Sequence, residues 1–200
     1  MRDEDLGLAC PNNMSSSASA GPRTWFITGC SSGFGRAIAE AALQAGDRVV
    51  LTARDVSSIE SLAAVVPEQA LALALDVTNE DQIHAALDAA VERFGPLDVV
   101  VNNAGWTHRN KPYLEVTEAE FDKVYAINVK SVYLSALHAV PVFRKQGGGC
   151  FVNIASTAGL RPRPGLTKWA VVAARRRTKI SPSLWISCEN LHSSAANNNN

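Results

Sequence analysis

Thr28-Gly29-Cys30-Ser31-Ser32-Gly33-Phe34-Gly35 is the stretch that decides the fold of this chain. It stands between an apolar run, Thr24 to Thr28, and an alanine-rich segment that favours a helix. Glycines at such a junction allow a tight turn, close approach of the backbone to an anion, and close packing of helix on strand, while the helix N-terminus offers unpaired N–H groups. The stretch therefore predicts a strand, a phosphate-binding turn and a helix, with a dinucleotide as the ligand.

The composition predicts one globular, cytoplasmic domain. With 200 residues, 46% of them hydrophobic, the chain can fill one core but not two. Lys plus Arg and Asp plus Glu number 19 each, so no net charge favours nucleic acid or an anionic membrane. The four cysteines form no Cys-x-x-Cys pair, which argues against a metal site and fits a reducing compartment. We find no secretory pattern and no window long enough to span a bilayer.

Residues 1–22 are polar and small, so we expect a disordered N-terminal tail. From Thr24 on, apolar runs alternate with helical segments in a βα rhythm. The apolar runs lack polar alternation, as in parallel strands that helices cover on both faces. This predicts an α/β fold with a doubly wound parallel sheet. The expected strands are Thr24–Thr28, Arg48–Ala53, Ala70–Leu75, Leu97–Val101 and Cys150–Ala155, and the expected helices before the last strand include Gly35–Ala45, Ser57–Val66 and Asn79–Phe94.

Two helix starts carry N-cap and N3 spacing, namely Thr78 with Asp81 and Thr117 with Glu120. The second start opens a long helix, which Pro141 is expected to kink or end. Apolar residues at three- and four-residue steps predict a buried stripe that also contains Asn128. The stripe comprises Phe121, Val124, Tyr125, Val132, Ala136 and Ala139.

Five motifs occur in a fixed order along the chain. They are Thr28-Gly29-x-x-x-Gly33-x-Gly35, Asp76-Val77, Asn102-Asn103-Ala104-Gly105, Asn128, and Asn153-Ile154-Ala155-Ser156. On these motifs the chain resembles the short-chain dehydrogenase/reductase family from about Thr24 to Thr167. The resemblance implies a Rossmann-type sheet that is incomplete on its C-terminal side, a domain over residues 23–167, and hydride transfer between a nicotinamide and a small carbonyl or alcohol.

The resemblance also implies roles for single residues, and no metal. Ser156 is the catalytic residue that would hydrogen-bond the substrate carbonyl, and Asn128 would hold a proton-relay water at a helix kink. Asp76 and Val77 would border the adenine end of the cofactor. The implied cofactor-binding residues are Thr28, Gly29, Ser31, Ser32, Gly33, Phe34, Gly35, Arg54, Asp76, Val77, Asn103, Ala104 and Gly105.

Each of these positions has a plainer alternative. The run from Asn102 to Gly105 could be an ordinary turn, because Asn and Gly tolerate left-handed backbone angles. Asp76 could merely belong to the turn before the next helix, and Asn128 could be a buried amide satisfied by nearby backbone. A serine in a turn, such as Ser156, needs no catalytic role. His108, in the loop expected to border the substrate, is more simply a surface residue.

The end of the second strand reads Thr52-Ala53-Arg54-Asp55 and bears on the choice of cofactor. An acidic side chain there accepts hydrogen bonds from a ribose 2′-hydroxyl, whereas an arginine pairs with a 2′-phosphate. Arg54 therefore favours NADP over NAD, and Asp55 leaves NAD open. Arg36 is either a second phosphate contact or a solvated charge on the helix surface.

The chain departs from the family where a Tyr-x-x-x-Lys pair normally supplies the acid/base groups. It reads Lys168-Trp169-Ala170-Val171-Val172-Ala173, and an indole N–H is a donor only. Neither Tyr125 nor Tyr133 has a lysine four residues on. We therefore expect a chain that is inactive as written. The alternatives are a non-catalytic NADP-binding protein or an unstable fragment with exposed apolar surface.

Residues 168–200 do not match the family and are expected to be poorly ordered. Our leading hypothesis for this abrupt loss of pattern is a shifted reading frame, a retained intron or an alternative transcript end. The missing parts would include a helix of the usual subunit interface, so a homo-oligomer would be weakened. We interpret Arg175-Arg176-Arg177 as a solvated helix end rather than a nucleic-acid patch.

Overall fold

The computed structural model describes residues 21–156 and a strand at 184–190. The strands are β1 Thr24–Ile27, β2 Arg48–Ala53, β3 Ala70–Ala74, β4 Val99–Asn102, β5 Cys150–Ser156 and β6 Leu184–Asn190. The helical elements are α1 Gly33–Gln44, α2 Ser57–Val65, α3 Glu80–Phe94, the 3-10 turn η1 Tyr113–Glu115, α4 Glu118–Tyr125, the π-helical turn η2 Ala126–Lys130 and α5 Ser131–Gln146. Trp169, Ala173, the arginine run 175–177 and almost all of the predicted tail 1–22 lie outside the described residues.

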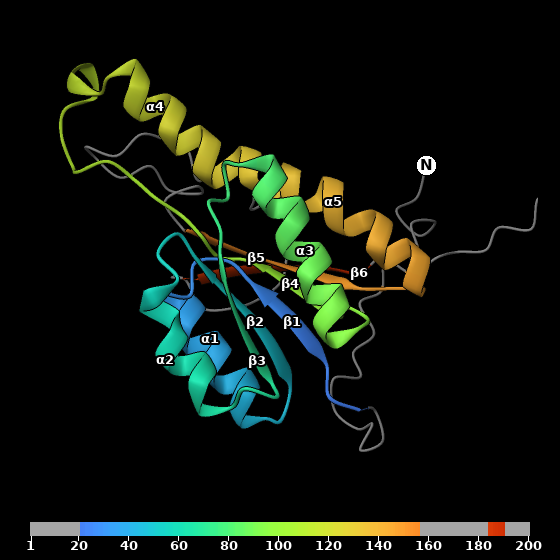
Figure 1. The fold of residues 1–200 in the computed structure, drawn as a ribbon. Coiled ribbons are helices and arrows are strands. Elements are labelled where there is room, and N and C mark those ends of the chain that lie inside the picture. The colour runs from blue at the N-terminus through green and yellow to red at the C-terminus, as the bar shows by residue number, and fades with distance from the viewer. Residues whose placement is uncertain (1–20, 157–183, 191–200) are drawn as a thin grey trace, which may run out of the picture.

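The strands form one sheet in the order β3-β2-β1-β4-β5-β6, and β1 to β5 run parallel. Helices α1 and α2 cover one face, while α3 and the long α4–α5 run cover the other (Figure 1). The predicted doubly wound parallel sheet is therefore confirmed. Because the chain moves outward from β1 to β3 and then returns to place β4 on the other side of β1, the strand order reverses between β1 and β4. In open α/β sheets, ligands bind at such a switch point.

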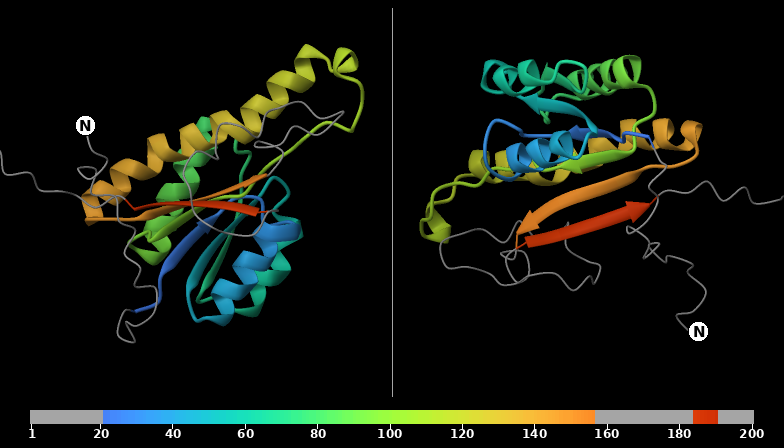
Figure 2. Two further views of the ribbon diagram at one scale, coloured as in Figure 1. Left: turned by 180° about the vertical axis from the view of Figure 1, so that it is seen from behind. Right: turned by 90° about the horizontal axis from the view of Figure 1, so that it is seen from below.

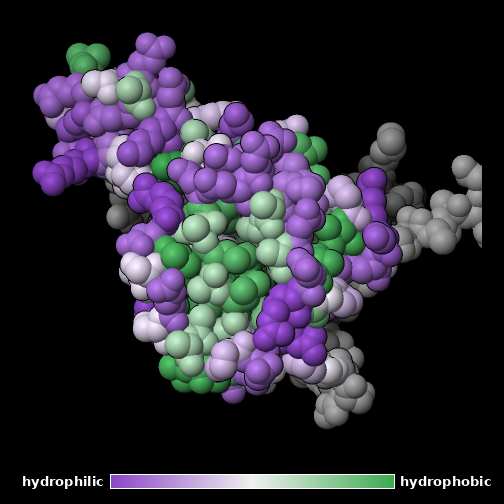
Figure 3. Space-filling view, in the orientation of Figure 1, coloured by the Kyte–Doolittle hydropathy of each residue, from purple (hydrophilic) through white to green (hydrophobic). Residues whose placement is uncertain are grey.

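Each face of the sheet has its own core. Ile27, Val49 and Leu51 point toward α1 and α2, whereas Phe26 and Val50 point toward α3 and α5. Neighbouring residues of a strand thus face opposite cores, and neither face of the central strands is left to water. At the outer edge β3 is only partly covered, and Figure 3 shows apolar side chains gathered there between α2 and α3.

Strand β6 pairs antiparallel with β5, from Ser156 opposite Leu184 to Cys150 opposite Asn190 (Figure 2). No strand is expected from the sequence within residues 168–200, so this pairing departs from the prediction. The physical reason is the exposed edge of β5, whose unpaired N–H and C=O groups are a template for another strand. The segment 184–190 contains Trp and Ile, which favour strands.

The helix ends agree with the sequence except at two places. Thr117 and Glu120 form the predicted capping box of α4. Helix α3, however, is capped by Asn79 rather than Thr78, because the hydroxyl of Thr78 donates to Asp76 instead. Pro141 lies inside α5, which continues to Gln146. Pro141 is on the exposed side of the helix, where water can bond to the carbonyl that its ring leaves unpaired.

The predicted buried stripe holds only in part. Val124 and Ala139 are buried, but Phe121 and Tyr125 are 38% and 45% exposed. Helix α4 projects past the sheet, so residues that periodicity assigns to a core lie beyond it there (Figure 1).

The inward face of the following helix, α5, carries Ser131, Leu134, Ser135, Ala139 and Phe143. The run Glu118–Gln146 is long and apolar enough to cross a membrane by length and composition, contrary to the sequence analysis. Leu134, Ala139 and Phe143 of this run belong to the core under the sheet.

Candidate dinucleotide site

Thr28, directly after β1, joins the glycine turn to the end of β4. Its hydroxyl donates to the carbonyl of Val101 (3.2 Å) and accepts hydrogen bonds from the N–H groups of Asn103 (2.9 Å) and Ala104 (3.0 Å). A hydroxyl has one donor and two acceptor positions, so all three are used. Thr28 therefore connects the glycine turn to the loop that follows β4, which we call the post-β4 loop.

Glycine is required where the turn meets Asn103. The side-chain amide of Asn103 donates to the carbonyls of Thr28 (2.8 Å) and Gly29 (3.0 Å). A Cβ on Gly35 would overlap the carbonyl oxygen of Gly29 and the amide nitrogen of Asn103. Gly29 itself has a φ of 73°, in the region that favours glycine. Gly29, Gly35 and Asn103 therefore form an interlock, by which we mean a contact so close that only glycine fits at position 35.

The N-terminus of α1 differs from those of α3 and α4. Asn79 and Thr117 cap α3 and α4 with their side chains, and both helices carry two acidic residues in the first turn. In α1 the N-cap Ser32 makes no side-chain cap bond, and the first turn has no acidic residue. Its first N–H groups and the positive end of its dipole are therefore available to an external anion. A Cβ on Gly33 would meet nothing within 4 Å, so open space lies beside the turn.

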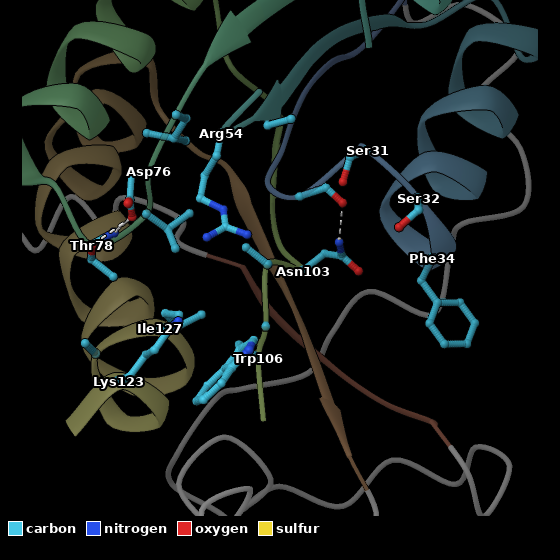
Figure 4. Close-up of a pocket in the computed structure, with 17 residues that line it drawn as sticks. Ser31, Ser32, Phe34, Arg54, Asp76, Thr78, Asn103, Trp106, Lys123 and Ile127 are labelled. Atoms are coloured by element: carbon cyan, nitrogen blue, oxygen red, sulfur yellow. Dashed lines mark hydrogen bonds between the residues drawn. The ribbon is translucent and has the colours of Figure 1, made fainter. Parts of the chain in front are cut away.

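A cavity of about 510 Å³ opens at this helix end, over the carboxyl ends of β1, β2, β3 and β4. Its charged residues are Arg54, Asp76 and Lys123. Figure 4 shows Arg54 between Asp76 on one side and the serines of the glycine turn on the other. The lining comprises Gly29, Ser31, Ser32, Phe34, Ala53, Arg54, Leu75, Asp76, Val77, Thr78, Asn103, Ala104, Gly105, Trp106, Lys123, Ala126 and Ile127.

Most of the predicted cofactor-binding residues line this cavity; Thr28, Gly33 and Gly35 are the three that do not. Seven further lining residues were not among those predicted, namely Ala53, Leu75, Thr78, Trp106, Lys123, Ala126 and Ile127. A signal for some of them was present. Trp106 follows the Asn-Asn-Ala-Gly motif, Ile127 precedes Asn128, and Lys123 lies one helical turn before Ile127.

The charged groups near the cavity are unequally engaged. Asp76 accepts hydrogen bonds from the N–H (2.9 Å) and hydroxyl (2.7 Å) of Thr78, and these bonds, helped by Arg54, lower its pKa. Asp55 lies outside the lining and accepts from Ser57 through N–H (3.1 Å) and hydroxyl (2.7 Å).

Arg36 also lies outside the lining. Its guanidinium donates to Glu40 (2.9 Å) and to the carbonyl of Ser58. In this structure it is therefore a paired charge on the helix surface, and a phosphate contact of Arg36 stays a prediction.

Asn128 lies in the π-helical turn η2, behind Gly105. Its amide oxygen accepts from the N–H of Trp106 (2.9 Å) and its amide nitrogen donates to the carbonyl of Trp106 (2.7 Å). In this turn the N–H of Ser131 donates to the carbonyl of Ala126, and the hydroxyl of Ser131 donates to the carbonyl of Ile127 (2.5 Å). The side chain of Asn128 thus fixes the post-β4 loop, in line with the alternative that its amide is satisfied by nearby backbone. π-Helical turns such as η2 are frequent at functional sites.

Two further residues flank this region. Ser156 ends β5 and is exposed, outside the cavity lining. His108 is buried at 3% exposure, contrary to the expectation of a surface residue, and its Nδ1 lies 2.7 Å from the carbonyl of Arg109. Three residues further on, Lys111 ties this loop to α4 by donating to both carboxylate oxygens of Glu120 at 2.8 and 2.6 Å.

Comparison with known proteins agrees with this geometry. A family model described as short chain dehydrogenase matches residues 23–173, six residues beyond the boundary expected at Thr167. The chain is 51% identical over 144 residues to 4-formylbenzenesulfonate dehydrogenase of Comamonas testosteroni, which covers 70% of this chain and 57% of that protein. It is 40% identical over 149 residues to 2-(R)-hydroxypropyl-CoM dehydrogenase of Xanthobacter autotrophicus, covering 72% and 60%.

Among solved structures, the 3-ketoacyl-(acyl-carrier-protein) reductase of Brucella melitensis, complexed with NADH, superimposes with a TM-score of 0.72. The sequence identity is 35%, and the match covers 76% of this chain and 64% of that one. The chain thus spans less than two thirds of the length of these relatives. Over the span that it shares with them, fold and sequence agree, and the chain belongs to the short-chain dehydrogenase/reductase family.

Proposed function

We propose that the cavity binds NADP, and NAD more weakly, as part of an oxidoreductase that moves hydride between the nicotinamide and a small carbonyl or alcohol. One observation carries this proposal: the acid-free N-terminus of α1 opens, without a side-chain cap, into a cavity that contains Arg54. A pyrophosphate would accept the free N–H groups of the first turn. Gly33 would let it approach the backbone closely, since nothing occupies the space beside that residue.

The preference for NADP follows from how the two side chains after β2 are engaged. Among the described residues the guanidinium of Arg54 forms no ion pair and donates no hydrogen bond, so it can pair with a 2′-phosphate. The carboxylate of Asp55, which would accept the ribose hydroxyls of NAD, is already bonded to Ser57 and lies outside the cavity lining.

When bound, the nicotinamide supplies the hydride donor or acceptor, and the protein has to place the substrate and move a proton. We assign substrate placement to Ser156 and support of the loop beside the nicotinamide to Asn128. None of the chain's three tyrosines is followed by a lysine four residues on, so the usual proton donor is missing from the sequence. The chain as written therefore binds cofactor without turnover.

Titration with NADPH and NADH by calorimetry tests binding, and a panel of ketones with NADPH tests turnover. We expect a lower Kd for NADPH and no oxidation of NADPH above background. Turnover would refute the inactive state, and no binding of either nucleotide at millimolar concentration would refute the cofactor site. Aggregation of the purified chain would favour the alternative of an unstable fragment.

We also propose a cytoplasmic protein that forms a weakened homo-oligomer. The four cysteines form no Cys-x-x-Cys pair, which fits a reducing compartment. Tyr133 and Leu137 of α5 are 62% and 45% exposed, one helical turn apart, which suits contact with a second copy. Light scattering across a range of concentrations measures the oligomer, and Tyr133→Ser should shift it toward the monomer.

A further inference from the structure

We propose that Lys123 is an anion-binding residue of the dinucleotide cavity, acting on the phosphates of the cofactor, and that Trp106 positions it. The inference rests on the proposed function, because it concerns the same cavity. The cavity is lined by two cations, Arg54 and Lys123, and by one carboxylate, Asp76. Two cations against one carboxylate give the lining a net positive charge, which suits an anionic ligand.

Lys123 has no acidic neighbour to neutralise it on its own helix. The positions one turn away are Ala119, Ala126 and Ile127. The remaining one, Glu120, holds the ammonium group of Lys111 at 2.8 and 2.6 Å. No ion pair to Lys123 occurs among residues 21–156. Its charge is therefore available to a bound anion.

The only described contact of the Lys123 ammonium is with an aromatic ring. Its Nζ lies 4.5 Å from the centroid of the Trp106 ring, a cation–π contact. The backbone N–H and carbonyl of Trp106 are in turn held by the side-chain amide of Asn128, which fixes the position from which the ring projects. The ring thus holds the ammonium group at the cavity without neutralising it, since an aromatic face carries no formal charge. Figure 4 shows Lys123, Ile127 and Trp106 together on one side of the cavity, across from Ser31, Ser32 and Phe34.

The test measures nucleotide affinity, which does not require turnover. We compare Lys123→Met with Lys130→Met, a matched loss of charge on the same helical run that leaves the cavity lining intact. Because Lys123 is exposed, water weakens its bond to the phosphate, and we expect about a tenfold rise in the Kd of NADPH. Lys123→Arg should restore most of the affinity, and Lys130→Met should stay within about twofold of wild type.

The same titrations with NADH distinguish the 2′-phosphate, which only NADPH carries, from the pyrophosphate, which both nucleotides carry. We expect a larger loss with NADPH, which indicates that Lys123 acts on the 2′-phosphate. Equal losses with both nucleotides also support the proposal and locate the contact at the pyrophosphate. Unchanged affinity for both nucleotides in Lys123→Met overturns it. If the wild-type protein binds neither nucleotide, the proposed cofactor site itself is refuted. That result differs from one in which the wild type binds and Lys123→Met binds equally well, which refutes only the role of Lys123.

The role of Trp106 is tested by the ring itself. Trp106→Leu removes the aromatic face and should raise the Kd of NADPH about threefold, whereas Trp106→Phe should keep most of the affinity. In the Lys123→Met background the Leu substitution should add nothing, because no cation is left to position. Additive losses in the double variant would show that Trp106 acts independently of Lys123.

Discussion

Replacing Gly35 by alanine should lower the free energy of unfolding of this domain more than alanine at any other glycine of the turn. The new Cβ would overlap the carbonyl oxygen of Gly29 and the amide nitrogen of Asn103, and would lie 3.0 Å from the carbonyl carbon of Gly29. Both sides of the overlap are held, since Asn103 donates to Thr28 and Gly29. The turn can move only by breaking those bonds.

The magnitude follows from two contributions. Overpacking costs about 1–3 kcal/mol, and loss of a buried hydrogen bond about 1 kcal/mol more. We therefore expect the free energy of unfolding to fall by about 3 kcal/mol, a large part of the 5–15 kcal/mol typical of a domain. With a urea m-value of about 2 kcal/mol/M, the unfolding midpoint should fall by about 1.5 M.

Two other glycines separate packing from backbone strain and from ligand binding. Gly33 (φ 63°) and Gly46 (φ 84°) both lie in the left-handed region, and a Cβ on either would meet nothing within 4 Å. Alanine at each should cost about 1–2 kcal/mol from the backbone alone. Only Gly33→Ala should also weaken NADPH binding, because Gly46 lies at the far end of α1.

Urea unfolding followed by circular dichroism, at equal protein concentration for all three variants, provides the comparison. A Gly35→Ala midpoint equal to that of Gly46→Ala would refute the interlock, since both would then show backbone cost only. An unchanged NADPH affinity in Gly33→Ala would refute the assignment of the anion to the start of α1.

Burial raises the pKa of the Cys30 thiol from 9.0 to about 12, so iodoacetamide at pH 8.5 should leave Cys30 unmodified until urea unfolds the chain. The unfolded thiol ionises above pH 9 while the folded one stays protonated, so the free energy of unfolding should fall by up to about 1.4 kcal/mol per pH unit between pH 9 and 12, a slope that Cys30→Ala should remove. The hydrogen bond from Lys111, and to a smaller extent the one from the N–H of Thr117, lower the pKa of Glu120 from 4.5 to about 2. The contribution of these bonds to stability is therefore present above pH 4.5 and is lost as the pH falls through 2. Thermal melts of Glu120→Gln and wild type should therefore differ at pH 7 and converge near pH 2, and a constant difference would contradict this assignment. Tryptic peptides of the natural protein that begin at Trp169 would establish the sequence after Thr167, whereas peptides with Tyr-x-x-x-Lys would support a misread gene.

The parts predicted correctly from sequence are those that local pattern determines. The five parallel strands follow from apolar runs, and the α4 cap follows from Thr117 and Glu120. Local pattern did not decide which hydroxyl caps α3, because Thr78 had Asp76 as a competing partner.

Errors arose where three-dimensional neighbours decide. The glycine motif does not reveal that Arg36 pairs with Glu40 and with the carbonyl of Ser58. Tyr125 follows the helical period of a buried face, yet the sheet ends before reaching it. Lys123 carries no motif, and its place in the cavity depends on how α4 crosses the loop after β4. Strand β6 depends on the free edge of β5, which the sequence of 184–190 alone does not reveal.

The bonds from Asn103 to Thr28 and Gly29 also bear on the order of events during synthesis. They join residues 75 and 74 positions apart, and β1 has no partner on that side until β4 arrives. The glycine turn leaves the ribosome early, but it lacks its fixed shape until three helices later, when residue 104 is available. A nascent chain shorter than this can form β1, α1 and β2, yet its phosphate-binding turn stays unfinished. Cofactor can therefore stabilise the chain only in the later part of its synthesis.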